Sequence, residues 1–255
     1  MNQKYVSGIL GVVFAGLALA GCASHSPSDD VVTESATERL INTDVAMAGI
    51  YLNEGKLNFA KEKADKAIAL DSHNSQANHI NGLLYWRLGE LDKADRYFRR
   101  AIRYQSDNAE ALNNYGAFLC DQKHYDQSIE FFDRAAANPL YKDRAKALAN
   151  AGRCLALKGD KLRAETYLRK ALKIDANYPS ALFELSKLAF HSGRTLTARE
   201  FLSRLFATGV TSSDSLYLAY RVEIAMGNRA GASKYARWLR SKYPKSREAA
   251  RVPTQ

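Results

Sequence analysis

Three cysteines and five histidines are the side chains of this 255-residue chain best suited to nucleophilic, redox or metal chemistry. They form no recognisable catalytic pattern, because the sequence contains no HExxH, no CxxC, no GxSxG and no phosphate-binding GxxxxGKS/T. The histidines are scattered at positions 25, 73, 79, 124 and 191. Most acidic residues stand beside Lys or Arg on the expected helices, which is typical of surface pairing. We therefore expect no catalytic residues, no metal, no cofactor and no small-molecule substrate.

Cys22 stands at the end of an apolar stretch near the start of the chain. Lys4 provides a positive charge, residues 6–20 are mostly apolar, and the letters LAGC end at Cys22. The stretch has about fifteen residues, fewer than the roughly 20 that a membrane-spanning helix needs. It resembles a bacterial lipoprotein signal, which implies a signal peptide over 1–21 and a covalent lipid on the Cys22 thiol. The alternative is an ordinary secretory signal with an incidental cysteine.

The residues after Cys22 are polar and include Pro27 with several Ser, Asp and Thr. They predict a lipidated, flexible tether over 22–37, and a coil of that length spans on the order of 20 Å. Ala23 and Ser24 follow the cysteine, which resembles lipoproteins sorted to the outer membrane of Gram-negative bacteria. The expected location is therefore the outer membrane, with the folded part anchored by lipid and facing the periplasm.

A small residue recurs at intervals of 34 to 36 residues, at Ala48, Gly82, Gly116, Gly152 and Ser186. A period of 34 is the signature of tetratricopeptide repeats, in which each unit is a pair of antiparallel helices. The sequence therefore predicts an all-α fold, a right-handed superhelical solenoid of six units over 38–245, followed by a mobile tail over 246–255. The expected units are about 41–74, 75–108, 109–144, 145–178, 179–212 and 213–245.

The residues inside each unit fit this packing. Position 8 of the first helix and position 20 of the second are small, and position 24 is large and apolar, as in Gly82, Ala94 and Phe98. Glycines at 55, 89, 159, 193 and 227 mark the ends of first helices, and Lys123 takes that place in the third unit. A generic helical bundle with chance spacing is the alternative.

Stacked units of this kind have a concave wall formed mainly by the first helices, whose positions 2, 5, 9, 12 and 13 usually face inward. Arginine and aromatic residues at these positions predict a groove for an extended peptide or a strand of a partner protein. The alternative is that Phe183 and Phe190 pack between neighbouring helices and do not line a groove. Val45 and Gly49 stand where chaperone-binding members have Lys and Asn, so a carboxylate clamp is not expected. The predicted groove residues are Leu83, Trp86, Arg87, Asn113, Arg153, Phe183, Lys187, Phe190, Tyr217 and Arg221.

Cys120 and Cys154 remain once Cys22 is acylated. They fall on adjacent first helices that pack side by side, and an even pair in an oxidising periplasm favours a disulfide. Two buried thiols that act as small apolar fillers are the alternative.

The chain carries 37 Lys and Arg against 27 Asp and Glu, a net charge of +10. Such a charge suits nucleic acid, anionic lipid or an acidic protein. No block of Lys and Arg is longer than two residues, however, and the basic residues are spread along the expected helices. A solvated surface is the simpler interpretation, and we expect no nucleic-acid partner.

Two segments go beyond the general repeat pattern, NNYGAFLC over 113–120 and NAGRC over 150–154. Together with the LAGC junction, six units and the closing Tyr243-Pro244, they resemble the PilF/PilW family of type IV pilus biogenesis and stability lipoproteins, the pilotins. The resemblance implies an outer-membrane adaptor that binds the type IV pilus secretin subunit and promotes its localisation and multimerisation, with Cys22 as the lipid-bearing residue. The alternatives are a repeat lipoprotein that serves peptidoglycan synthesis or type II secretion, and an enzyme with a buried titratable cluster in its groove.

Overall fold

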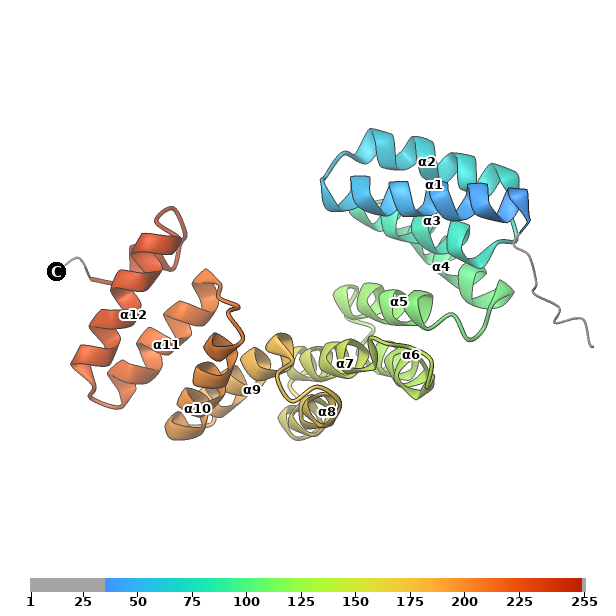
Figure 1. Ribbon diagram of the computed structural model, residues 1–255. Coiled ribbons are helices and arrows are strands. Elements are labelled where there is room, and N and C mark those ends of the chain that lie inside the picture. Colours follow the sequence, from blue (N-terminus) through green and yellow to red (C-terminus); the bar gives the residue numbers. More distant parts are fainter. Residues whose placement is uncertain (1–34, 254–255) are drawn as a thin grey trace, which may run out of the picture. The chain divides into compact units, whose positions relative to one another are not determined.

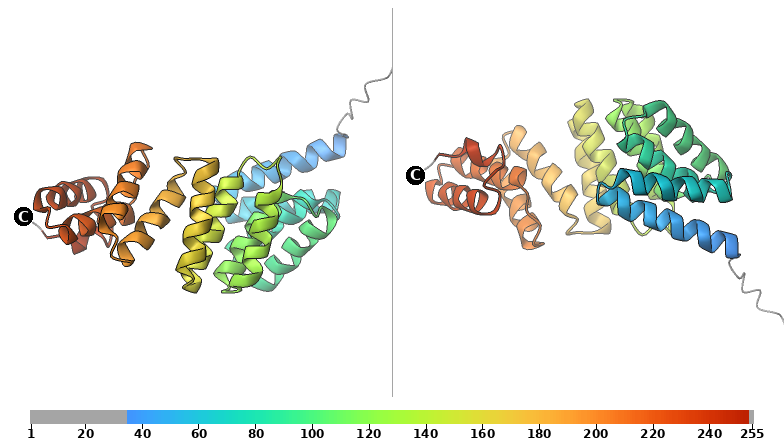
Figure 2. Two further views of the ribbon diagram at one scale, coloured as in Figure 1. Left: turned by 90° about the horizontal axis from the view of Figure 1, so that it is seen from below. Right: turned by 90° about the horizontal axis from the view of Figure 1, so that it is seen from above.

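The structure, a computed structural model, describes residues 35–253, and the predicted signal peptide, Cys22 and the predicted tether up to residue 34 lie outside the described residues. Residues 35–253 contain helices only, so the predicted all-α repeat fold is confirmed. The helices form pairs that stack along a bent row (Figure 1), and Figure 2 shows each pair beside the next. The elements are α1 (Ala36–Asn53), α2 (Leu57–Leu70), α3 (Ser75–Arg87), α4 (Leu91–Tyr104), α5 (Ala109–Asp121), α6 (Tyr125–Ala137), α7 (Arg144–Lys158), α8 (Lys161–Ile174), α9 (Pro179–His191), α10 (Thr195–Ala207), α11 (Ser213–Ala225), α12 (Arg229–Lys242) and the short 3-10 helix η1 (Ala249–Arg251).

The starts of the first helices follow the 34-residue period. α3, α5, α9 and α11 begin at residues 75, 109, 179 and 213, which open the predicted units, and α7 begins one residue before 145. Side-chain caps explain several of these starts: Asn74 Oδ1 accepts from the backbone N–H of Ala77 at 2.9 Å, and Asn108 Oδ1 does the same for Ala111 at 3.0 Å. Such caps satisfy N–H groups that have no partner inside the helix.

The predicted end of the tether at residue 37 is wrong. Helix α1 begins at Ala36, because Ser35 Oγ accepts from the backbone N–H of Glu38 at 3.1 Å and so caps the helix there. The first helix of the first unit is therefore longer than the first helices that follow it.

The turn between the two helices of a unit requires a left-handed residue. Glycines 55, 89, 159, 193 and 227 have φ between 72° and 94°, a conformation that glycine adopts without steric cost. Lys123 holds the same conformation, with φ of 63°, in the third unit. The packing of the two helices therefore imposes this turn even where the residue type does not favour it.

Inside each hairpin the two helices approach closely at position 8. A Cβ atom added to Gly82 would lie 2.8 Å from the Phe98 ring, and one added to Gly116 would lie 3.0 Å from the Phe132 ring. At Gly152 the added atom would lie 2.6 Å from Leu168 Cγ. The large residue at position 24 thus occupies the space that the missing side chain leaves, as the sequence pattern predicts.

Consecutive units are joined by polar contacts as well as by the apolar core. An arginine on the second helix of a unit reaches back to a backbone carbonyl in the loop after the preceding unit's second helix. The donor and acceptor pairs are Arg100 to Ser72 at 2.9 Å, Arg134 to Ser106 at 2.9 Å and Arg204 to Ala176 at 2.6 Å. These bonds satisfy loop carbonyls that the helices themselves leave without a partner.

The predicted mobile tail over 246–255 is wrong for its described part. Ala249 in η1 and Val252 are only 6% and 4% exposed, and they belong to a core cluster with Leu216 of α11 and Leu239 of α12. Burial of these apolar side chains holds the segment against the last hairpin. No described helix combines the length and the apolar character needed to cross a membrane.

The close approach at position 8 leads to a stability prediction. We expect Gly152→Ala to destabilise the fold by about 1–3 kcal/mol, because the new methyl group overlaps Leu168 and lies 3.1 Å from the carbonyl oxygen of Ala164. The matched control is Gly49→Ala, whose Cβ would lie 4.0 Å from Ile80 Cδ1 and which gains about 0.5–1 kcal/mol of helix propensity. Urea unfolding followed by circular dichroism measures both; equal midpoints for the two variants would contradict this account of the packing.

Candidate functional site

The first helices α1, α3, α5 and α7 together line a groove of about 890 Å³, called here the N-terminal groove. Its walls come mostly from positions 2, 5, 9, 12 and 13 of the first two units, the positions expected to face inward. Figure 1 shows first helices such as α5, α7 and α9 on the inner side of the bend. The lining residues are Asn42, Val45, Ala46, Gly49, Leu52, Asn53, Gln76, His79, Ile80, Leu83, Trp86, Arg87, Glu110 and Lys146.

The floor of the N-terminal groove is apolar. Val45 and Gly49 lie on it, so the places where a carboxylate clamp would present an ammonium and an amide offer only hydrocarbon and backbone. Trp86 is held in place, because its Nε1 donates to Asp121 Oδ2 at 3.2 Å and its ring meets the Phe118 ring edge-on with centroids 5.8 Å apart. A fixed aromatic side chain in a recess is typical of a binding hot spot.

The rim of the N-terminal groove carries charges of both signs. Arg87 is exposed at the end of α3, Lys146 lies at the start of α7, and Glu110 lies between them on α5. His79 lies on the wall but is buried, and its burial together with the nearby Lys146 ammonium lowers the pKa of His79 to about 4. The imidazole is therefore neutral at the pH of most cellular compartments, and the groove presents two basic groups against one acidic group.

Asn113 does not line a groove, and its prediction as a groove residue is wrong. Its side chain is 0% exposed and belongs to a hydrogen-bonded row that crosses three first helices. Asn114 Nδ2 lies 2.8 Å from His79 Nε2, Asn113 Nδ2 donates to Asn114 Oδ1 at 3.2 Å, and Asn150 Nδ2 donates to Asn113 Oδ1 at 3.0 Å. The asparagines of the two sequence motifs therefore tie α3, α5 and α7 together.

A second hollow of about 570 Å³, called here the middle groove, lies between α7, α8 and α9. Two predicted groove residues, Arg153 and Lys187, line it. Lys187 Nζ forms an ion pair of 2.9 Å with Glu184, a carboxylate that is otherwise buried. The remaining lining residues are Ala156, Leu157, Lys161, Leu188 and His191. The middle groove is thus smaller than the N-terminal groove and lined by more basic side chains.

The other predicted groove residues pack against neighbouring side chains. Phe183 and Phe190 lie half-buried against the core, where Lys187 Nζ is 5.4 Å from the Phe183 ring centre and Arg221 Cζ is 4.8 Å from that of Phe190. Tyr217 is half-buried in the C-terminal cluster, with Arg251 above its ring. These contacts agree with the alternative that the phenylalanines pack between helices.

Sequence reasoning named Leu83, Trp86 and Arg87 of the N-terminal groove but did not select its α1 residues. The inward-position rule, applied to the first unit, gives five of them: Asn42, Val45, Gly49, Leu52 and Asn53. They are small, apolar or amide residues, and a search for charged or aromatic hot spots passes over them.

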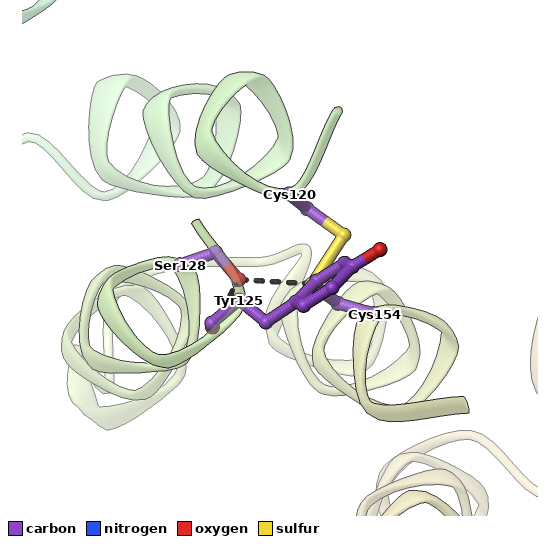
Figure 3. Close-up of a disulfide and its surroundings, with 4 residues drawn as sticks. All are labelled: Cys120, Tyr125, Ser128 and Cys154. Atoms are coloured by element: carbon purple, nitrogen blue, oxygen red, sulfur yellow. Dashed lines mark hydrogen bonds between the residues drawn. A yellow bond between two sulfur atoms is a disulfide. The ribbon is translucent and has the colours of Figure 1, made fainter. Parts of the chain in front are cut away.

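The two remaining cysteines are joined in a disulfide between α5 and α7 (Figure 3). The Cα atoms of Cys120 and Cys154 are 5.9 Å apart, both side chains are buried, and Ser128 Oγ lies 2.9 Å from Cys154 Sγ. Figure 3 shows the ring of Tyr125 beside the bridge. Residues 35–253 contain no group of three His, Cys, Asp or Glu that could hold a metal ion. The chemistry of the motif cysteines is thus structural and links the third unit to the fourth.

Comparisons with known proteins agree with the repeat architecture. Family models of the tetratricopeptide repeat match residues 81–142 and 145–178. The type IV pilus assembly protein PilF of Pseudomonas aeruginosa is 26% identical over 237 residues, which cover 93% of this chain and 94% of PilF.

Solved structures give the same relatives. The crystal structure of PilW, a widely conserved type IV pilus biogenesis factor, superposes with a TM-score of 0.75 at 30% identity, over 85% of this chain and 99% of PilW. The structure of Pseudomonas aeruginosa PilF superposes with a TM-score of 0.73 at 27% identity, over 85% of this chain and 97% of PilF. A repeat protein from Parabacteroides merdae, with a TM-score of 0.61 at 17% identity, shares the fold.

The disulfide leads to a prediction about stability under reducing conditions. The bridge closes a loop of 34 residues, and the loss of chain entropy in the unfolded state corresponds to about 3–4 kcal/mol. We expect dithiothreitol to lower the urea midpoint of the oxidised protein, and the double variant Cys120→Ala/Cys154→Ala to have a similarly lowered midpoint that no longer responds to the reductant. Free thiols at Cys120 and Cys154 in the unfolded, unreduced protein would contradict the bridge.

Proposed function

This chain belongs to the PilF/PilW family of tetratricopeptide-repeat proteins of type IV pilus biogenesis, and from this premise we propose that it acts as a pilotin. In this role it is a lipid-anchored adaptor in the outer membrane that faces the periplasm. It binds the subunit of the pilus secretin and promotes the localisation and multimerisation of that subunit in the outer membrane. Its repeats match families of scaffold proteins that mediate protein–protein interaction, and not families of enzymes.

The N-terminal groove is the observation that carries the proposed binding function. It combines an apolar floor from α1 and α3 with the fixed Trp86 ring and the exposed Arg87 guanidinium. Trp and Arg are the residue types most enriched at binding hot spots, because they supply a large contact area and directed hydrogen bonds. An apolar floor with a charged rim suits a segment of a partner protein that presents apolar side chains at regular spacing.

The geometry of the groove also suits binding without a large rearrangement. The polar row from His79 to Asn150 links α3, α5 and α7, and the disulfide links α5 to α7. A preformed site loses little conformational entropy when its partner binds. The links between α3, α5 and α7 therefore limit the rearrangement that binding requires on this side of the groove.

The lipid anchor supplies the second half of the proposed mechanism. Cys22 and the tether lie outside the described residues, and α1 begins at Ala36, so about fourteen residues separate the acylated cysteine from the fold. A tether of that length keeps a bound secretin subunit next to the membrane. Subunits held in this thin layer meet one another at a raised effective concentration, which favours their multimerisation.

The groove can be tested by two substitutions. Loss of a hot-spot side chain costs roughly 2 kcal/mol or more, so we expect Trp86→Ala to weaken binding of the purified secretin periplasmic domain by about 30-fold or more. Arg87→Glu, which reverses a charge on the rim, should also weaken binding of the secretin periplasmic domain. The matched control is Arg103→Glu, an exposed charge reversal on α4.

Isothermal titration calorimetry measures the affinities, and thermal unfolding checks that each variant is folded. Secretin binding that Trp86→Ala and Arg87→Glu leave unchanged would exclude the N-terminal groove as its site. Binding to peptidoglycan synthases or to a type II secretion component in place of the pilus secretin would assign the scaffold to another envelope machine.

The anchor can be tested by Cys22→Ser. We expect this variant to fold normally, to incorporate no radiolabelled palmitate and to leave the outer-membrane fraction, because the acyl chains provide the membrane affinity. Secretin multimers in the outer membrane should fall to the level of a deletion strain. Normal multimers in the Cys22→Ser strain would refute delivery by the anchor.

A further inference from the structure

The last hairpin, α11 and α12, ends the row of units, and no further helix pair follows it among the described residues (Figure 1). Each earlier hairpin is covered on that side by the first helix of the next unit. Helix α11, for example, packs on α9 and α10, where Ala198 and Leu202 are buried and Arg221 covers the Phe190 ring. The corresponding side of α11 and α12, called here the terminal face, includes Ile224 and Ala236 at the positions of Phe190 and Leu202.

The closing segment covers one half of the terminal face. Ala249 and Val252 pack on Leu216 and Leu239, at the start of α11 and the end of α12. Arg240 of α12 donates a hydrogen bond to the backbone carbonyl of Pro253 and so ties the segment down. The half of this face around Leu216 and Leu239 is therefore already covered.

The other half of the terminal face is open and forms a hollow of about 450 Å³. Its floor includes Tyr220 and Ala236, and Ile224 stands at its edge with 52% of its surface exposed. Position 8 of this unit is the large Tyr220 and position 24 the small Ala236, which reverses the sizes found in the inner units. The hollow thus has an apolar floor that resembles an uncovered contact between units.

Arginines surround this hollow. Arg229, Arg237 and Arg240 line it, and Arg229 and Arg237 have no ion-pair partner among residues 35–253. Residues 229–251 contain eight Lys and Arg and one acidic residue, Glu248, so the positive charge of the chain is concentrated here and not evenly spread. Unpaired guanidinium groups around an apolar floor favour a ligand that brings carboxylates to them.

We propose that the terminal face binds a helix of a partner protein that carries acidic side chains on either side of an apolar stripe. The helix lies in the open half of the terminal face beside the closing segment, places its apolar stripe on Tyr220 and Ile224, and pairs its carboxylates with Arg229 and Arg237. A second copy of the same face is disfavoured because two arginine clusters repel each other. This site is separate from the N-terminal groove and adds a second partner to the proposed adaptor.

The test uses a defined fluorescent peptide. It copies residues 212–227, the segment that covers the equivalent face of the fifth unit, with glutamate in place of Arg221, so that the net charge of its side chains changes from −1 to −3. The control peptide keeps the arginine and replaces its Asp and Glu by Asn and Gln. All proteins carry Cys22→Ser, so that no acyl chain contributes to binding, and fluorescence anisotropy measures the affinity.

We expect the acidic peptide to bind saturably and the control peptide to bind at least about tenfold more weakly. Arg229→Glu/Arg237→Glu should weaken binding of the acidic peptide by about tenfold or more, and Ile224→Asp should do the same by placing a carboxylate at the apolar edge of the hollow, next to those of the peptide. The matched control Arg103→Glu/Lys173→Glu, with the same change in net charge, should change the affinity by less than about twofold. Trp86→Ala should leave it unchanged, so that failure here is independent of failure at the N-terminal groove.

Several outcomes would overturn the proposal. These are the absence of saturable binding, equal losses in the arginine variant and its matched control, or equal affinity for the two peptides. Binding to phosphatidylglycerol vesicles that the arginine double variant loses, while peptide binding is unaffected, would assign the face to a membrane surface instead. Concentration-dependent dimers in sedimentation that the same variant abolishes would assign it to a second copy of this chain.

Discussion

The close approach of two helices at position 8 is the contact on which the other features of the fold depend. Gly82, Gly116 and Gly152 have no side chain, and the rings of Phe98 and Phe132 and the side chain of Leu168 fill the space beside them. This contact sets the distance and angle between the helices of a hairpin. The left-handed turn follows from it, as Lys123 shows by adopting φ of 63° without the freedom of glycine. Stacking of equal hairpins then produces the inner wall on which the grooves lie.

The two motifs that distinguish this chain from a general repeat protein are architectural. In NNYGAFLC and NAGRC the asparagines form the polar row between first helices, the glycines allow the close approach, and the cysteines form the bridge. The asparagine row and the bridge join the third unit to the fourth, whereas each glycine acts inside its own hairpin. A buried polar row whose members are hydrogen-bonded to one another also fixes the register of neighbouring helices. The centre of the row of units is thus a rigid support.

The candidate binding surfaces lie where the repeat pattern is least regular. The first unit has Ala48 with Ala64 and the sixth has Tyr220 with Ala236, in place of a glycine with a large side chain. The N-terminal groove and the hollow of the terminal face lie beside these two units. Inner units are covered by neighbours on both sides, whereas among the described residues the terminal face is covered only in part, by the closing segment. Binding at the ends is consistent with an adaptor that contacts more than one protein.

The sequence by itself determined the repeat, its six units and the boundaries of most first helices, because contacts inside a hairpin join residues about 16 positions apart and recur with the period. It also indicated Leu83, Trp86 and Arg87, since inward positions follow from helix geometry alone. Only the tertiary structure decided that Asn113 is buried, that the segment after Pro244 is packed, and that arginines spread over 229–240 surround one hollow. The physical reason is that the exposure of a side chain depends on which neighbouring unit or segment covers it. Such contacts join residues at irregular separations along the chain, and the periodicity of the sequence does not reveal them.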